Sequence, residues 1–216
     1  MTVTRSPGAA PRRGRREHRK ILTRRELLAA GRKLFGEQGL YDSRIEDLSR
    51  HAGIAKGTLY GYFANKEALM ASVVTSAFGE LLGEARLAAR GARTYPELLA
   101  RVAQAHLEFF AENPDLMRIF HQVRGVLKFK RPEAIALRPA LATYLAGLGR
   151  VLEQSAPARR GEHDPLDSAT VLFGAVSGIA STRAALGSPG LRAARSGPTV
   201  RALVALVLAH EGRVTP

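Results

Sequence analysis

The chain has 216 residues, and 45% of them are hydrophobic, a share that suffices for a globular protein with a buried core. It contains no cysteine, which excludes a disulfide framework, a thiolate metal site and a cysteine nucleophile. The formal net charge is +14, and residues 1–66 carry +9 of it, so a polyanion is the expected partner, either nucleic acid or an anionic membrane surface.

No membrane-spanning segment is expected. The longest uncharged run near the C-terminus, Ser168 to Thr182, is shorter than the roughly 20 apolar residues that a spanning helix needs. The basic N-terminus is not followed by the apolar stretch of a secretory signal. We therefore predict a cytoplasmic protein without a membrane partner.

The first element in chain order is a basic arm. Residues 1–20 are rich in Arg, Pro and Gly and have almost nothing apolar to bury, so they are expected to be disordered. From Thr23 the pattern becomes helical and ends at Gly39. Its apolar residues recur at helical spacing: Leu27, Ala30, Gly31, Leu34 and Phe35.

Two short helices follow this one. Ser43 and Glu46 have the S-x-x-E spacing of a capping box, in which each side chain satisfies a free backbone N–H group at a helix start. The spacing predicts a helix of about eight residues that ends at Gly53. Ile54 and Leu59 are the apolar anchors of the next short helix.

The remainder of the chain is also predicted to be helical. Asn65 is a candidate N-cap of a long helix, and the pair Asn113 and Pro114 separates two further helices. Later helices are expected at about 133–155, 166–187 and 199–212, with breaks at Pro157, Pro165 and Gly187 to Gly190. No alternating strand pattern occurs, so the predicted fold class is all-α.

Two short helices joined by a turn at Gly53 are typical of a helix-turn-helix, whose second helix enters the major groove of DNA. Small residues at the start of that helix let its backbone approach the bases, and Ala55, Gly57 and Thr58 are of this kind. The predicted partner is double-stranded DNA.

The sequence from Thr23 to Leu69 resembles the DNA-binding domain of the TetR/AcrR family of transcriptional regulators. The resemblance rests on LF-x-E-x-G at Leu34 to Gly39 and on AG-x-x-KGTLY-x-YF-x-x-KEAL at Ala52 to Leu69. It implies a three-helix DNA-binding domain at residues 21–67, after the arm at 1–20, and a helical ligand-binding and dimerisation domain at 68–216. It also implies a homodimer on an inverted-repeat operator.

Residues with DNA-binding roles follow from the same resemblance. Those expected to meet DNA are Ser43, Arg44, Ala55, Lys56, Gly57, Thr58, Tyr60, Tyr62 and Lys66. Hydroxyl groups and lysines suit phosphate contacts, while Lys56 and Thr58 also suit base edges. Tyr60 and Tyr62 could instead be core aromatics, which Phe63 is expected to be.

Two positions depart from the family pattern. Ala55 stands where the family often has serine, and Gly61 stands where it often has a larger polar residue, frequently histidine. Each departure removes a possible DNA contact. The Arg-rich arm could compensate by entering an adjacent minor groove, or it could be a solubilising tail.

The C-terminal half contains polar and aromatic residues that could line a ligand pocket. The candidates are His106, Phe109, Phe110, Met117, Phe120, His121, Arg124, Tyr144 and Phe173. His106 and His121 lack the spacing of metal ligands, so neither a metal site nor a cofactor is predicted.

Small and apolar residues near the C-terminus indicate a dimer interface of the four-helix kind that the resemblance implies. One set lies in the helix expected at 166–187: Gly174, Ser177, Gly178, Ala180 and Ser181. The other lies in the last helix: Leu203, Val204, Leu206, Val207 and Leu208. Both helices could instead pack only within one subunit.

The predicted function is a sequence-specific, non-enzymatic DNA-binding regulator, most simply a repressor released by a small apolar or amphipathic effector. One alternative is a helix-turn-helix nucleoid or cell-division factor without an inducer. Another is a small helical enzyme or carrier with a basic face, although no nucleophile elbow, phosphate-binding loop or dinucleotide fingerprint occurs.

Overall fold

The structure is a computed structural model that describes residues 12–127, 132–154, 164–186 and 197–212. Every regular element in these ranges is a helix. They are α1 (Arg12–Gln38), α2 (Ile45–Ala52), α3 (Lys56–Tyr60), α4 (Lys66–Ala89), α5 (Tyr95–Glu112), α6 (Pro114–Val126), α7 (Pro132–Gln154), α8 (Pro165–Ala185) and α10 (Gly197–Gly212). The all-α prediction is confirmed.

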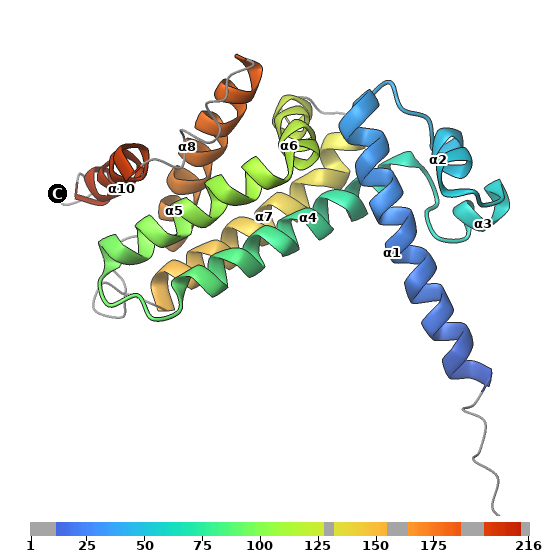
Figure 1. Cartoon of the computed structure of the whole chain (residues 1–216), viewed down its shortest axis with the longest axis horizontal. Helices are drawn as coiled ribbons and strands as arrows, with labels where there is room; N and C mark the ends of the chain where they lie inside the picture. Colours follow the sequence, from blue (N-terminus) through green and yellow to red (C-terminus); the bar gives the residue numbers. More distant parts are fainter. Residues whose placement is uncertain (1–11, 128–131, 155–163, 187–196, 213–216) are drawn as a thin grey trace, which may run out of the picture.

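The helices form a small N-terminal unit and a larger C-terminal unit (Figure 1). In the first, α2 and α3 lie beside α1. In the second, α4 packs along α7 and α5, while α8 and α10 close the far end. α1 also packs against α4 and α6, so it joins the two units.

Helix α4 is the central core helix. Asn65 caps it as predicted, with its side-chain oxygen accepting a hydrogen bond from the Ala68 N–H at 2.8 Å. By length and composition alone α4 could cross a membrane, but half of its most apolar stretch is buried inside the protein. The predicted inward face is buried throughout: Leu69, Val73, Ala77 and Leu81.

Helix α1 begins earlier than predicted. The sequence pattern placed its start at Thr23, whereas the helical backbone begins at Arg12, so the disorder expected for residues 1–20 is wrong from Arg12 onward. Residues 12–22 are mostly Arg, Lys, Glu and Leu, which favour helix, and Pro11 precedes them. The part of the arm at residues 1–11 lies outside the described residues. The N-terminal half of α1 projects away from the rest of the molecule (Figure 1).

A buried carboxylate anchors the last helix. Glu211 of α10 is 2% exposed, and its Oε1 accepts hydrogen bonds from the Tyr95 hydroxyl at 2.5 Å and the Ser168 hydroxyl at 2.7 Å. These bonds tie α10 to α5 and α8, because a buried carboxylate that loses its donors is costly.

Candidate DNA-binding surface and effector site

The turn between α2 and α3 is fixed by local chemistry. Gly53 has a φ of +62°, a left-handed conformation that favours glycine, and it ends α2 as predicted. The Ile54 N–H donates to the Ser49 carbonyl at 3.1 Å, and the Ser49 hydroxyl donates back to the Ile54 carbonyl at 2.6 Å. This reciprocal pair holds α3 at a set angle to α2.

The predicted capping box is wrong by one residue. α2 begins at Ile45, its N-cap is Arg44, and an Asp47 carboxylate oxygen accepts a hydrogen bond from the Arg44 N–H at 3.3 Å. Glu46 therefore does not reach back to the backbone. Ser43 is 2% exposed, and its hydroxyl has no hydrogen-bond partner in the described residues. In this conformation that hydroxyl does not face solvent, where a phosphate would bind.

Helix α3 has one buried anchor and an exposed face. Leu59 is fully buried, and Phe63 beyond the helix is 2% exposed, so these two side chains attach α3 to the core. The exposed residues from this stretch are Ala55, Lys56, Gly57, Thr58 and Tyr60. The division between anchoring and exposed residues agrees with the sequence analysis.

Two of the predicted DNA contacts have protein partners in this structure. The Tyr60 hydroxyl donates to a Glu46 carboxylate oxygen at 3.3 Å, and the Lys66 Nζ donates to the Tyr41 carbonyl at 2.8 Å. Partial desolvation and the neighbouring Glu46 raise the pKa of Tyr60, so its hydroxyl remains a hydrogen-bond donor. Tyr62 is half-buried and packs its ring against the core, and its hydroxyl has no hydrogen-bond partner in residues 12–127 or the other described ranges.

Gly61 is not required by the backbone. Its φ is −69°, a right-handed conformation open to any residue, and the position is exposed. A Cβ there would lie 3.2 Å from the Thr58 carbonyl oxygen, a tight contact with the backbone. At this position the surface presents backbone alone, where the family pattern often has a larger polar side chain.

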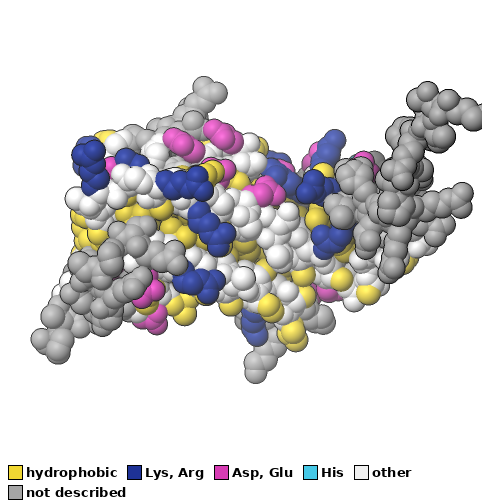
Figure 2. All heavy atoms as spheres, turned by 90° about the horizontal axis from the view of Figure 1, so that it is seen from below, with side chains coloured by type: hydrophobic (Ala, Val, Ile, Leu, Met, Phe, Trp, Pro, Cys, Tyr) yellow, Lys and Arg dark blue, Asp and Glu magenta, His cyan; other side chains and the backbone are white. Residues whose placement is uncertain are grey.

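Positive charge is not restricted to the N-terminal unit. On the face seen in Figure 2, Lys and Arg side chains are distributed along the visible surface with acidic side chains among them. This face therefore contributes, beyond the N-terminal unit, to any long-range attraction of a polyanion.

Most of the predicted effector residues lie in one buried aromatic cluster. The cluster also includes Phe78 of α4, which is not among the predicted effector residues. The centre of the Phe78 ring lies 4.6 Å from that of Phe120 and 4.7 Å from that of Tyr144. The sequence does indicate that Phe78 is buried, because it follows Ala77 on the inward face of α4. The predicted members are His106, Phe109, Phe110, Phe120, Tyr144 and Phe173.

One polar pair lies inside this cluster. His106 is fully buried; its Nδ1–H donates to the Val102 carbonyl at 2.8 Å, and its Nε2 accepts a hydrogen bond from the Tyr144 hydroxyl at 2.5 Å. Burial lowers the pKa of His106 to about 4, so the imidazole is neutral. Burial also raises the pKa of Tyr144, which therefore remains a donor.

The other predicted effector residues lie apart from this cluster. Met117 and His121 line a cavity of about 310 Å³ between α6 and α8. Arg124 donates to the Ser177 hydroxyl at 3.3 Å and does not line that cavity. The described residues that line it are Met117, Arg118, His121, Gln122, Ser181, Ala184 and Ala185.

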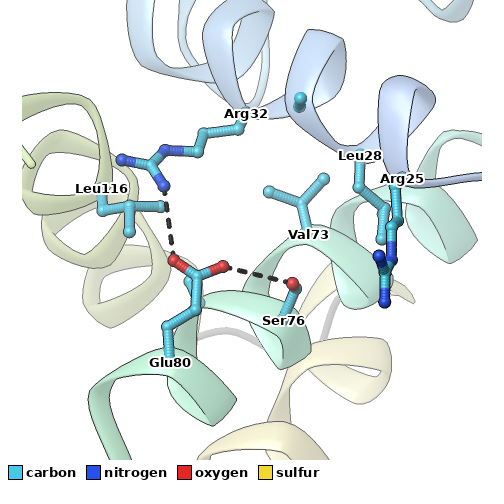
Figure 3. A pocket seen from close by; sticks show the side chains of 9 residues that line it. Arg25, Leu28, Arg32, Val73, Ser76, Glu80 and Leu116 are labelled. Carbon is cyan, nitrogen blue, oxygen red and sulfur yellow. Dashed lines mark hydrogen bonds and ion pairs between the residues drawn. The ribbon is translucent and has the colours of Figure 1, made fainter. Parts of the chain in front are cut away.

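A charged network connects α1 to the C-terminal unit. The Arg32 guanidinium pairs with Asp115 and donates to the Asn113 side chain at 2.6 Å. Burial opposes ionisation of Asp115, but the hydrogen bond from Arg32 keeps its pKa below the usual value. Arg32 also lies 3.4 Å from Glu80, which accepts a hydrogen bond from Ser76 (Figure 3). Arg32, Ser76 and Glu80 border a second cavity of about 320 Å³ between α1, α4 and α6.

Backbone groups of α1 and its C-terminal loop are also bound by α6. The Arg118 Nε donates to the Gly36 carbonyl at 2.8 Å, and the Gln122 side-chain oxygen accepts from the Leu40 N–H at 2.6 Å. Gly36 lies so close to Asp115 that a Cβ would be 2.8 Å from the Asp115 Cβ. We call these contacts, together with the Arg32 pair, the α1–α6 seam.

Residues 27–73 match the family model of bacterial regulatory proteins of the tetR family. The fatty acid metabolism regulator protein of Bacillus subtilis is 28% identical over 91 residues, which are 42% of this chain and 47% of that protein. The HTH-type transcriptional regulator EthR of Mycobacterium tuberculosis is 37% identical over 76 residues, or 34% of this chain and 35% of that protein. The chain thus aligns with half or less of the length of either protein.

Solved structures extend the likeness of the fold. The structure of the transcriptional regulator FadR from Bacillus subtilis in complex with stearoyl-CoA has a TM-score of 0.70 and 21% identity over 83% of this chain and 96% of that one. Salmonella enterica GusR has a TM-score of 0.71 and 20% identity over 88% of this chain and 95% of that one. The C-terminal helices therefore have the arrangement found in these proteins.

Proposed function

We propose that the chain is a DNA-binding regulator of the TetR family, as the match of residues 27–73 to that family model supports, and that it acts as a homodimeric repressor of an inverted-repeat operator, released by a small effector. The observation that carries this proposal is the exposed face of α3, held on the core by Leu59 and Phe63. Lys56 and Thr58 read base edges from that face, and Tyr60, Tyr62, Arg44 and Lys66 bind phosphates.

The dimer would form through α8 and α10. Gly174 and Gly178 are one turn apart on α8, and a Cβ at either would meet nothing within 4 Å. Leu166 is 44% exposed and Leu206 of α10 is 50% exposed, so an apolar face is available to a second copy. Ser177 and Ala180 instead face the core of their own subunit, contrary to their expected place in the interface.

The effector would be an apolar or amphipathic small molecule bound by the C-terminal unit. This class agrees with the aromatic cluster and with the stearoyl-CoA bound to the Bacillus subtilis FadR. The half-sites of an operator recur about every 34 Å along DNA, so the two recognition helices of a dimer must match this spacing. An effector that binds more tightly to a dimer with another spacing weakens operator binding by linkage.

Selection of bound duplexes from a random pool tests the function. An inverted repeat is the expected result, and affinity for it should fall steeply with rising salt because phosphate contacts release counterions. Failure to enrich any duplex, or binding insensitive to salt, would contradict the proposal. A helix-turn-helix factor without an inducer would enrich a duplex but show no thermal stabilisation by lipophilic ligands.

The substitution Tyr62→Phe should weaken binding to every duplex alike by roughly 1 kcal/mol, because it removes one phosphate hydrogen bond and keeps the ring. Gel-shift titration against specific and random duplexes measures this loss. Tyr95→Phe is the matched control, since that hydroxyl binds Glu211 far from α3 and its loss should lower stability alone. Unchanged affinity would remove Tyr62 from the DNA-binding surface.

The substitution Thr58→Ala should change the preference among operator variants, because it removes a methyl group that can contact a thymine methyl. Competition between operators that differ at single positions measures the preference. Thr75→Ala, at an exposed position of α4, should leave it unchanged. A uniform loss of affinity would show that Thr58 reads no base.

A further inference from the structure

The cavity between α6 and α8 differs from the aromatic cluster in charge. Its ionisable lining residues, Arg118 and His121, are both basic, and no carboxylate is among its described lining residues. Met117, Ala184 and Ala185 supply an apolar surface beside them. The volume of about 310 Å³ lies at the lower end of the range of about 300–1,000 Å³ for small-molecule sites.

Donors in this cavity are available to a ligand. Arg118 uses only its Nε in the interactions of the described residues, toward the Gly36 carbonyl, so both Nη groups are free to bind an anion. Gln122 accepts from the Leu40 N–H through its side-chain oxygen, so its two amide N–H groups are likewise uncommitted in the described ranges. The Ser181 hydroxyl also lines the cavity, but it already donates to the Gly178 carbonyl at 3.1 Å.

Arg118 and Gln122 have a second role, because their hydrogen bonds belong to the α1–α6 seam. One bonds the Gly36 carbonyl at the end of α1, and the other bonds the Leu40 N–H just beyond it. A carboxylate attracts a guanidinium more strongly than a neutral carbonyl does. A ligand anion on the Nη groups uses the same guanidinium that holds the Gly36 carbonyl through Nε. A shift of this guanidinium toward the anion weakens the bond to Gly36 and couples this cavity to the DNA-binding unit.

We infer that the α6–α8 cavity binds a small carboxylate with an apolar body, and that its binding loosens the hold of Arg118 and Gln122 on residues 36–40. The acidic group meets Arg118 and Gln122, and the apolar body lies on Met117 and the two alanines. The regulatory effect of this site rests on the proposed function as a repressor, whereas binding of the carboxylate to the cavity does not require DNA.

Calorimetric titration of the full chain with octanoate, and with octylamine as the cationic counterpart, tests the site. Octanoate should bind and octylamine should not. Ala184→Leu fills the cavity and should weaken octanoate binding at least tenfold, whereas Thr182→Leu, at an exposed α8 position outside the lining, should not. Equal binding of both probes, or no effect of Ala184→Leu, would overturn the site.

Hydrogen exchange tests the coupling in the same samples. The Leu40 amide should exchange faster when octanoate is bound, because its acceptor on Gln122 is drawn away. Unchanged exchange at Leu40 with octanoate bound would overturn the coupling. Both measurements use protein without DNA, so their results do not depend on operator binding. A chain that selects no duplex would contradict the proposed repressor function but not the carboxylate site.

Discussion

Replacing Gly36 with alanine is expected to lower the free energy of unfolding by about 2 kcal/mol, as overpacking of a close contact does. A Cβ at Gly36 would lie 2.8 Å from the Asp115 Cβ and 3.2 Å from the Asp115 Cα. α1 and α6 must then separate, which strains the pair between Arg32 and Asp115 and the bond from Arg118 to Gly36. Urea denaturation measures the change in unfolding free energy.

A second glycine gives the matched control. Gly79 lies in the interior of α4, and a Cβ there would meet nothing within 4 Å. Gly79→Ala should therefore raise the free energy of unfolding by about 1 kcal/mol, the usual gain in helix propensity. The two substitutions make the same chemical change with opposite expected signs. If Gly36→Ala also raised the free energy of unfolding, α1 and α6 would lie farther apart at the α1–α6 seam than the structure shows.

Lowering the pH from 7 to 5 should cost on the order of 2 kcal/mol of stability through His106 alone. Burial lowers its folded-state pKa from 6.5 to about 4, so the unfolded chain takes up a proton in this range and the folded chain does not. The stabilising effect is fully present above pH 6.5 and is lost as the pH falls toward 4. Urea denaturation at each pH measures it.

The double substitution His106→Leu with Tyr144→Phe should abolish this share of the pH dependence. It removes both partners of the buried hydrogen bond, so neither is left unsatisfied, and stability at pH 7 should change little. His106→Leu alone should be more harmful, because the buried Tyr144 hydroxyl would lose its acceptor. An identical profile in the double variant would contradict the assignment to His106.

Predictions based on local patterns agree well with the structure. The position of Asn65 before an apolar-periodic run predicts a helix cap, and its side chain does accept a hydrogen bond from the Ala68 N–H. Gly53 is predicted to end a helix and has the left-handed backbone that favours glycine. The break at Asn113 and Pro114 separates α5 from α6. Such signals involve neighbours only a few residues away, so one sequence contains them completely.

Predictions that depended on a competing local interaction were less accurate. Ser43 and Glu46 have the spacing of a capping box, but the N-cap is Arg44, whose N–H donates to Asp47, and Glu46 instead accepts a hydrogen bond from Tyr60. Both arrangements satisfy the local chemistry. The packing of α3 against α2 brings Tyr60 to Glu46, and that contact joins residues 14 positions apart.

Short-range spacing in the sequence predicts the helical class, the turn at Gly53 and the anchors Leu59 and Phe63, and the motifs at Ala52 to Leu69 carry the resemblance to the TetR family. Which predicted effector residues come together depends instead on long-range packing, which one sequence does not contain. This packing buries His106 and Tyr144 in one cluster and places Met117 and His121 in a separate cavity. The α1–α6 seam is equally a product of the fold, since its hydrogen bonds link residues more than 80 positions apart.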